Sequence, residues 1–172
     1  MKRFLSLLLL VVVLAPSALA QVSRGDIEVG VDVGAVKFDS NVSDDTEPLA
    51  GLRAGWFLTD AFALELEARR AEVILNGEFQ TVMLNAQYNF NSRSTVNPYV
   101  FAGLGGANAE YEVLGVTVDD SSLAVSAGAG ARIFFAGGWA LRLQAGVLSE
   151  ETFDERSTHG VFTAGVSYRF SR

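Results

Sequence analysis

The segment His159–Phe170 alternates between two kinds of side chain, and it constrains the fold more than any other part of the chain. Successive side chains of a β-strand point to opposite faces of the sheet. One face of this segment is apolar and ends in aromatic residues, whereas the other is small or polar and carries Arg169. The pattern recurs about eight times, and the second face repeatedly holds ionisable residues that a dry core would not accept singly. A barrel with lipid outside and a polar interior accommodates both faces.

The predicted fold is all-β: an eight-stranded antiparallel up-and-down transmembrane β-barrel. From Gly160 to Phe170, at ~3.3 Å per residue and a tilt of ~40°, a strand rises about 25 Å, the height of an outer-membrane apolar band. Nothing after Gln21 is apolar for long enough to form a transmembrane helix, so membrane insertion requires a closed barrel. A soluble lipocalin-like barrel or sandwich would bury the apolar residues, which the interleaved charges oppose. The expected strands lie near 26–38, 49–58, 62–69, 82–90, 98–106, 125–133, 139–147 and 159–170.

The N-terminus has the pattern of a cleaved export signal over residues 1–20, followed by the barrel domain over residues 21–172. Lys2 and Arg3 precede a short apolar run, and small residues Ala18 and Ala20 stand before the expected cut at Gln21. The alternative, a membrane anchor, is disfavoured because the run is shorter than the ~20 residues of a spanning helix. The chain has no cysteine, which excludes a disulfide framework and a lipidated cysteine at the cut.

The connections and the aromatic residues suggest how the barrel lies in the membrane. Asn76-Gly77 and Gly137-Gly138 are predicted tight turns, and longer acidic loops are expected over 39–47, 108–122 and 149–158. Longer loops are typical of the extracellular side and short turns of the periplasmic side. Aromatic residues near the short-turn ends suggest an interfacial girdle: Trp56, Phe57, Phe62, Tyr88, Phe90, Tyr99, Phe134, Phe135, Trp139, Tyr168 and Phe170.

Five segments together resemble the small eight-stranded outer-membrane barrels of the OmpA and OmpX type: Trp56–Glu65, Asn85–Phe90, Pro98–Gly105, Ala127–Arg132 and Tyr168–Phe170. The resemblance implies an outer-membrane location in a Gram-negative-type envelope, with lipid and lipopolysaccharide as surroundings. It also implies periplasmic chaperones and the barrel-assembly machinery as partners during biogenesis. That machinery reads a C-terminal strand ending in an aromatic residue, although here Ser171 and Arg172 follow it. The expected assembly signal is Phe162, Val166, Tyr168 and Phe170.

Nearly balanced opposite charges are expected to face the barrel interior and to close it as an ion-pair network. Buried charges are costly unless they pair or hold water, and side chains can just fill an eight-stranded barrel. Inward glycines would give arginine and tyrosine side chains room. The predicted lumen network is Glu28, Asp32, Arg53, Glu65, Glu67, Arg69, Arg132, Arg142 and Arg169.

This reasoning predicts a non-catalytic role: envelope integrity, or surface contact through acidic loops. A narrow pore for small solutes and a lipid-modifying enzyme stay open as alternatives. The only histidine, His159, follows Ser157 and Thr158, and its plainer interpretation is a solvated strand end. No cofactor or metal is expected, since the acidic loops lack a calcium-loop motif. Removing Lys2 and Arg3 changes the net charge from −7 to −9, which argues against nucleic-acid binding; a monomer is expected.

Overall fold

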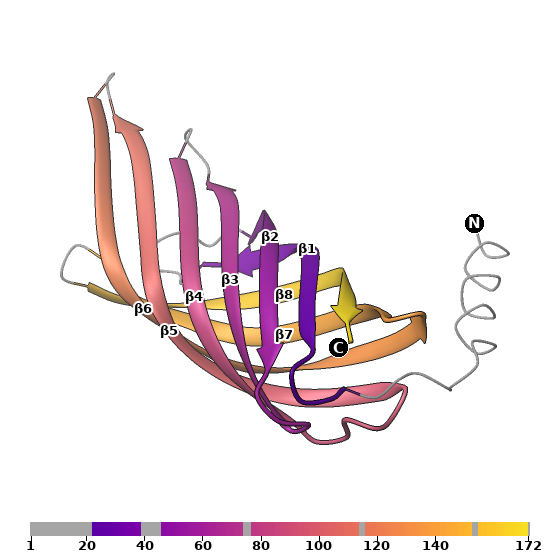
Figure 1. The fold of residues 1–172 in the computed structure, drawn as a ribbon. Helices are drawn as coiled ribbons and strands as arrows, with labels where there is room; N and C mark the ends of the chain where they lie inside the picture. The colour runs from indigo at the N-terminus through magenta and orange to yellow at the C-terminus, as the bar shows by residue number, and fades with distance from the viewer. Residues whose placement is uncertain (1–21, 39–45, 74–76, 114–115, 153–154, 172) are drawn as a thin grey trace, which may run out of the picture.

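Eight antiparallel strands close into one barrel, with neighbours in sequence order (Figure 1). The computed structural model describes residues 22–38, 46–73, 77–113, 116–152 and 155–171. The seam joins the two ends of the chain, because β1 pairs with β8 from Ile27 opposite Phe170 to Lys37 opposite Gly160. The predicted fold class is confirmed. Among the described residues, no helix is long and apolar enough to cross a membrane.

The strands follow the alternating segments of the sequence closely at the short-turn end of the barrel, and several are longer than expected at the other end. Alternation places one residue in two outward along each strand, as the burial pattern of β4 shows throughout its length. The strands are β1 (Ile27–Lys37), β2 (Thr46–Phe57), β3 (Phe62–Val73), β4 (Gly77–Asn89), β5 (Val96–Val113), β6 (Val116–Ala136), β7 (Trp139–Thr152) and β8 (Glu155–Phe170).

The outward faces of the strands form a continuous apolar band. Val33, Leu52, Leu104 and Phe162 each leave more than 60 % of their surface exposed. An apolar surface that surrounds a whole protein is incompatible with water but suits acyl chains. Lys37 on β1, Arg70 on β3 and Gln80 on β4 are exposed beyond this band, toward the end with the longer connections.

A girdle of outward aromatic residues lies at the short-turn end. Trp139 and Phe170 each pack edge-to-face on Tyr168, with ring centroids 5.0 and 4.8 Å away. Phe62 and Phe90 flank Tyr88 in the same way, each at 5.1 Å. Three residues expected in the girdle lie elsewhere: Phe57, Tyr99 and Phe134 are buried inside the barrel. Their position near a turn does not determine whether the side chains face lipid or the lumen. The alternation along each strand does.

Two of the predicted acidic loops are largely strand. The expected loop 108–122 is the outer part of a long β5–β6 hairpin that pairs as far as Val113 opposite Val116. The expected loop 149–158 is likewise part of a β7–β8 hairpin, pairing to Thr152 opposite Glu155. In both places the hydrogen-bonded ladder continues past the apolar band. There the residues no longer alternate between apolar and polar, so hydropathy does not indicate a strand. Residues 39–45 and the Asn76 position of the predicted Asn76-Gly77 turn lie outside the described residues, as does the predicted signal 1–20.

The Gly137-Gly138 turn between β6 and β7 is present as predicted. Both residues have positive φ, +48° and +94°, which L side chains rarely adopt. A Cβ on Gly138 would lie 2.7 Å from the carbonyl oxygen of Arg169, and the Gly138 carbonyl accepts a hydrogen bond from Arg169 N at 2.9 Å. The turn therefore needs glycine to hold β7 against β8.

Candidate functional site in the barrel lumen

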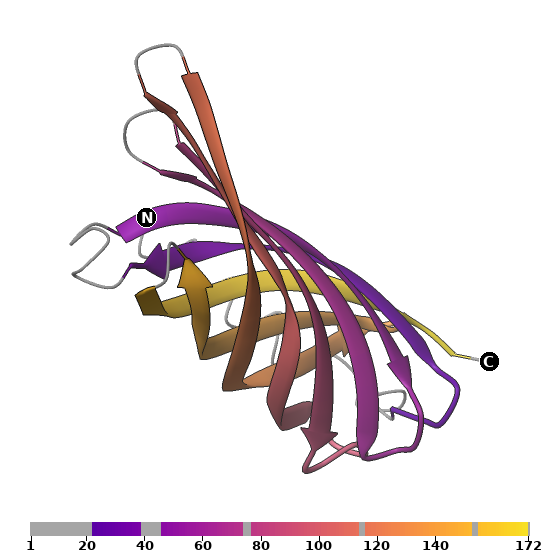
Figure 2. The ribbon, with the colours of Figure 1, turned by 90° about the vertical axis from the view of Figure 1, so that its left-hand side faces the viewer.

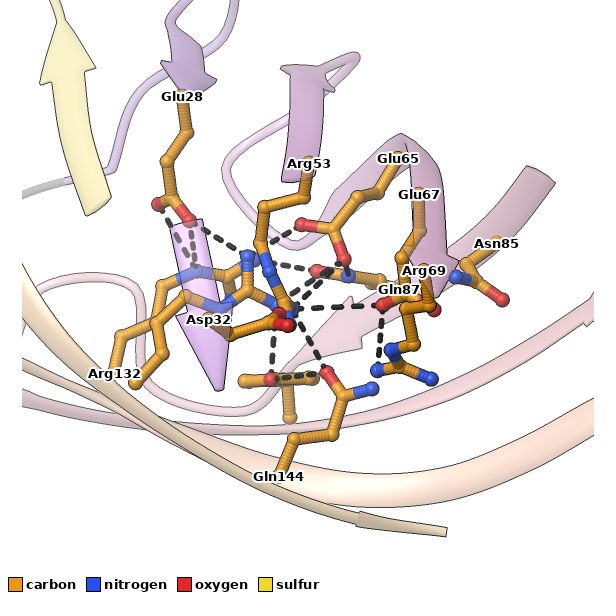
Figure 3. Close-up of polar contacts among 12 residues, drawn as sticks. Glu28, Asp32, Arg53, Glu65, Glu67, Arg69, Asn85, Gln87, Arg132 and Gln144 are labelled. Carbon is orange, nitrogen blue, oxygen red and sulfur yellow. Dashed lines mark hydrogen bonds and ion pairs between the residues drawn. The ribbon is translucent and has the colours of Figure 1, made fainter. Parts of the chain in front are cut away.

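All but one of the nine predicted lumen residues meet in the middle of the barrel, where their side chains contact one another (Figure 3). Eight of the nine are buried, and the Arg69 side chain is 11 % exposed. Four carboxylates and four guanidinium groups make up the central cluster, so the described charges balance. We call these eight residues the central network: Glu28, Asp32, Arg53, Glu65, Glu67, Arg69, Arg132 and Arg142.

Arg142 on β7 is the hub of the central network. Its Nη1 lies 2.8 Å from Glu28 Oε1 on β1 and also contacts Glu65 Oε2 on β3. Its Nη2 donates to Glu65 Oε1 at 3.2 Å and to the Tyr99 hydroxyl at 2.9 Å. Hydrogen bonds between charged groups are stronger than neutral ones, and here one guanidinium joins strands on opposite sides of the barrel.

Arg132 on β6 fills the layer next to Arg142. Its Nε lies 3.0 Å from Glu28 Oε2, and its Nη1 donates to Asn89 Oδ1 at 2.7 Å. The guanidinium carbon stands 4.4 Å from the Tyr99 ring centroid and 5.3 Å from that of Phe57. Arginine is suited to this position because its planar group stacks on rings while its N–H groups bind carboxylates and amides.

Arg53 on β2 joins the carboxylates on the extracellular side of Arg142. It contacts Asp32 on β1, and its Nη1 lies 3.4 Å from Glu65 Oε1 and 3.7 Å from Glu67 Oε2. Arg69 Nη2 completes the chain, 2.8 Å from Glu67 Oε2. Gln144 Oε1 accepts from Arg53 Nη1 at 3.1 Å and from the Tyr99 hydroxyl at 2.8 Å, which links this group back to the hub.

A buried apolar layer lies at the short-turn end of the lumen. It consists of Val22, Phe57, Ala63, Phe134 and Ala140, all buried. Val22 belongs to the segment Val22–Asp26, which crosses this end of the barrel before β1. The backbone N–H of Val22 donates to Ser92 O at 2.8 Å, and that of Gly25 donates to Phe57 O at 2.8 Å.

Arg169, the ninth predicted lumen residue, lies beside this apolar layer rather than in the central network. Its Nη1 is 3.5 Å from Asp26 Oδ2, and its guanidinium carbon stands 5.2 Å from the Phe134 ring centroid. Asp26 is buried and also accepts a hydrogen bond from Ser23 N at 2.9 Å. The carboxylate thus ties the segment before β1 to the end of β8.

A second apolar layer lies in the half of the lumen nearer the longer connections. The enclosed space beside Leu49 and Val161 measures about 20 Å³, enough for about one water molecule. By contrast, a hollow of about 740 Å³ beside Leu143 and Phe162 is on the outward side of the wall. The members of the outer layer are Val36, Phe38, Leu49, Ala71, Phe79, Met83, Ala107, Ala109, Ala124, Leu148 and Val161.

His159 is buried in this outer layer, so its interpretation as a solvated strand end is wrong. Only 1 % of its surface is exposed, and its ring packs edge-to-face on Phe38 and Phe79 with centroids 5.0 and 5.9 Å away. Its Nε2 lies 3.2 Å from Glu150 Oε1. Alternation along β8 points the His159 side chain into the barrel, where the two phenylalanines cover it.

Polar residues that were not among the predicted site residues complete the lumen. Gln87 bridges the two arginine layers, accepting from Arg132 and donating to Glu65 Oε1 at 2.6 Å. Tyr99, Asn89 and Gln144 supply the other neutral contacts. The sequence does show that these residues occupy inward positions in the alternation of β4, β5 and β7. The predicted lumen network did not include them because it was chosen from charged residues only.

Gly130 makes room for the Tyr99 ring. A Cβ built on Gly130 would lie 2.4 Å from the Tyr99 hydroxyl oxygen and 2.6 Å from the backbone oxygen of Leu143. We expect Gly130→Ala to destabilise the barrel by about 1–3 kcal/mol, because the backbone contact cannot relax freely. Urea unfolding in lipid vesicles measures this. Gly106→Ala is the matched control, since its Cβ would meet only Ser122 O at 3.9 Å; equal losses in both variants would contradict the prediction.

Comparison with known proteins shows which family and which solved structures the chain is similar to. The sequence matches the family described as Outer membrane protein beta-barrel domain over residues 5–170. Neisserial surface protein A has a similar structure, with a TM-score of 0.75 and 17 % identity over 86 % of this chain and 100 % of that one. The N-terminal barrel domain of Pseudomonas aeruginosa OprF gives 0.63 and 20 %, over 87 % and 100 %. Ail of Yersinia pestis gives 0.56 and 19 %, over 86 % and 99 %. No curated protein sequence matches the chain.

Proposed function

Because this chain belongs to the outer membrane protein β-barrel domain family, we propose that it is a non-catalytic outer-membrane barrel with a closed lumen. In this role it contributes to envelope integrity or contacts other molecules through its extracellular hairpins and loops. The observation that carries the proposal is the order of layers along the lumen. A charge-balanced central network lies between two apolar layers, one at each end.

This arrangement supports a plug rather than a pore. A hydrated ion passing along the axis would have to separate Arg142 from Glu28 and Glu65, leaving buried charges unpaired. It would also have to cross two mainly apolar layers, in which the buried polar groups already face one another as Arg169 with Asp26 and His159 with Glu150. A narrow pore for small solutes therefore has less support than a closed structural barrel.

Planar-bilayer recording tests the plug directly. Purified protein inserted into a bilayer should give no large, reproducible open-channel steps, because the layers leave no continuous water path. A porin inserted into the same bilayers is the positive control. Frequent, uniform steps from this protein, scaling with its concentration, would contradict the proposal and favour the pore.

A lipid-modifying activity has little support from the surroundings of His159. Its ring is enclosed by Phe38 and Phe79, and its Nε2 faces a carboxylate. A nucleophilic mechanism needs the base within reach of both nucleophile and substrate, and this base is covered on the lumen side. We expect lipid A from cells with and without the protein to have the same acylation by mass spectrometry. A change that disappears in a His159→Ala variant would establish the enzyme instead.

The expected biogenesis partners are part of the same proposal. Phe162, Val166, Tyr168 and Phe170 lie on the outward side of β8, within the apolar band and girdle. This arrangement supports recognition of β8 by the barrel-assembly machinery, after delivery by periplasmic chaperones, and final contact with lipid and lipopolysaccharide. The exposed residues of β8 between Phe162 and Phe170 are apolar, which supports a monomer surrounded by lipid.

A further inference from the structure

The strands β3, β4, β5 and β6 lie side by side in the barrel wall, and their outward residues change in the same order toward the longer connections (Figures 1 and 2). On β4, for example, the apolar residue Val82 is followed by Gln80 and then by Glu78. On each of the four strands, one residue is the first outward polar group beyond the apolar band, and the pairing registers place these four directly opposite one another. We call them the polar row: Arg70, Gln80, Asn108 and Ser121.

Two hollows on the outward side of the wall adjoin the polar row. One, of about 510 Å³, spans β1 to β4 over the small, exposed side chains of Ala50 and Ala68, and Gln80 lines its edge. The other, of about 330 Å³, spans β4 to β6, and Gln80, Asn108 and Ser121 line it. Because both hollows reach Gln80, an apolar hollow and a polar hollow meet on β4.

The charged member of the polar row is already paired. Arg70 Nη2 lies 2.5 Å from Glu78 Oε2, and Gln80 Nε2 also donates to the carboxylate of Glu78. Glu110 is exposed and stands opposite Glu78 in the register of β4 and β5. Two carboxylates therefore flank the polar row on the side away from the apolar band, and they disfavour an anionic headgroup such as phosphate. Hydroxyl groups fit this surface, because they donate to carboxylates and also accept from amide N–H groups.

We infer that the polar row and its two hollows bind an acylated sugar, a glycolipid. Its acyl chain lies in the 510 Å³ hollow, which is continuous with the apolar band, and its sugar hydroxyls lie against Gln80, Asn108 and Ser121. Apolar contact supplies affinity, and a few placed polar groups supply selectivity. The inference rests on the proposed function, since it names the headgroup chemistry of a lipid that the barrel contacts. It does not depend on whether the lumen conducts.

The hollow of about 740 Å³ beside Leu143 and Phe162 provides an internal comparison. Its outward residues, among those that the structure describes, are alanine, valine, leucine and phenylalanine. Such a surface accepts an acyl chain but gives the headgroup no hydrogen bond. Selection of a lipid by its headgroup is therefore expected at the polar row and not at this hollow.

Quenching of an added tryptophan by brominated lipids tests the proposal on the full barrel in phosphatidylcholine vesicles. Leu52→Trp places the probe beside the 510 Å³ hollow, and Leu143→Trp places it beside the comparison hollow. The signal of Trp56 and Trp139 is subtracted with the unmodified protein. The three probes are a galactosyl diacylglycerol, a phosphatidylglycerol and a phosphatidylcholine, all with the same brominated chains.

At Leu52→Trp we expect the galactolipid to bind about fivefold or more tightly than either phospholipid, the gain expected from one or two hydrogen bonds. At Leu143→Trp the three lipids should bind equally. Equal binding at both positions, or a preference for phosphatidylglycerol at Leu52→Trp, would overturn the proposal.

Variants in the Leu52→Trp background assign the preference to the polar row. Gln80→Ala combined with Asn108→Ala should abolish it, whereas Asn91→Ala combined with Ser171→Ala, two exposed polar residues at the short-turn end, should preserve it. Heat-modifiable gel mobility verifies that each variant is folded. A preference that survives the first pair of substitutions, or is lost with the second, would overturn the site.

Glu78→Gln tests why phosphate is not selected. Removing this carboxylate frees Arg70, so the relative affinity for phosphatidylglycerol should rise; no rise would contradict the role given to Glu78. Planar-bilayer recording of the same preparations separates this inference from the plug. A closed lumen without any headgroup preference overturns the glycolipid site alone, and open channels with the preference intact overturn the plug alone.

Discussion

Replacing Arg142 with methionine should destabilise the barrel by about 3–5 kcal/mol, the range for breaking a buried ion pair by removing one partner. The methionine fills similar space but leaves Glu28 and Glu65 without their shared guanidinium, and Tyr99 without its donor. Equilibrium unfolding in urea, followed by gel mobility and tryptophan fluorescence in vesicles, measures the loss.

The control for this variant is the exterior pair of Arg70 and Glu78. The Arg70 side chain is 61 % exposed, so Arg70→Met should cost less than about 1 kcal/mol. A further variant combines Arg142→Met with Glu65→Gln. It removes the charge of one of the two carboxylates that lost Arg142 as a partner, and it should recover part of the stability. If the three variants were equally stable, the central network would not hold the barrel together.

Placing an arginine at Leu143 should cost about 2–4 kcal/mol of folding free energy in a bilayer, the range for a charge on the lipid side near the midplane. Leu143 points outward in the middle of β7, between the girdle residue Trp139 and Val147 nearer the extracellular end. In water the same substitution on an exposed position would be nearly neutral. Folding into vesicles of defined thickness distinguishes the two environments.

Gln80→Arg is the matched control, because Gln80 points outward on β4 beyond the apolar band. Its cost should fall to about 0–1 kcal/mol, as expected near the interface. If Leu143→Arg were tolerated as well as Gln80→Arg, the outward surface around Leu143 would not lie in hydrocarbon.

The alternation of residues was enough to predict the barrel and the inward side of the nine lumen residues. Glu65 and Glu67 alternate with the outward residues Leu64, Leu66 and Ala68, so the charges had to face inward together. The partners within the lumen were not predictable in the same way. Glu28 meets Arg142 across the barrel, and that contact depends on register and strand tilt, which a local pattern does not contain.

The outer part of the molecule was harder to predict for a related reason. Hydropathy identifies strands only where one face meets lipid, so the ladder from Asn108 to Ser122 appeared as a loop. His159 appeared as a rim residue because its neighbours are polar in sequence. Its cover, Phe38 and Phe79, comes from strands that are distant along the chain.

The central network also bears on how slowly the barrel opens. Glu28 is separated from Arg132 by 104 residues and from Arg142 by 114, and it meets them only once the seam between β1 and β8 has formed. We expect contacts of such long sequence separation to form after the transition state for folding, and contacts of that kind slow unfolding without accelerating assembly. A barrel stabilised in this way stays folded in the membrane for long periods because it unfolds slowly.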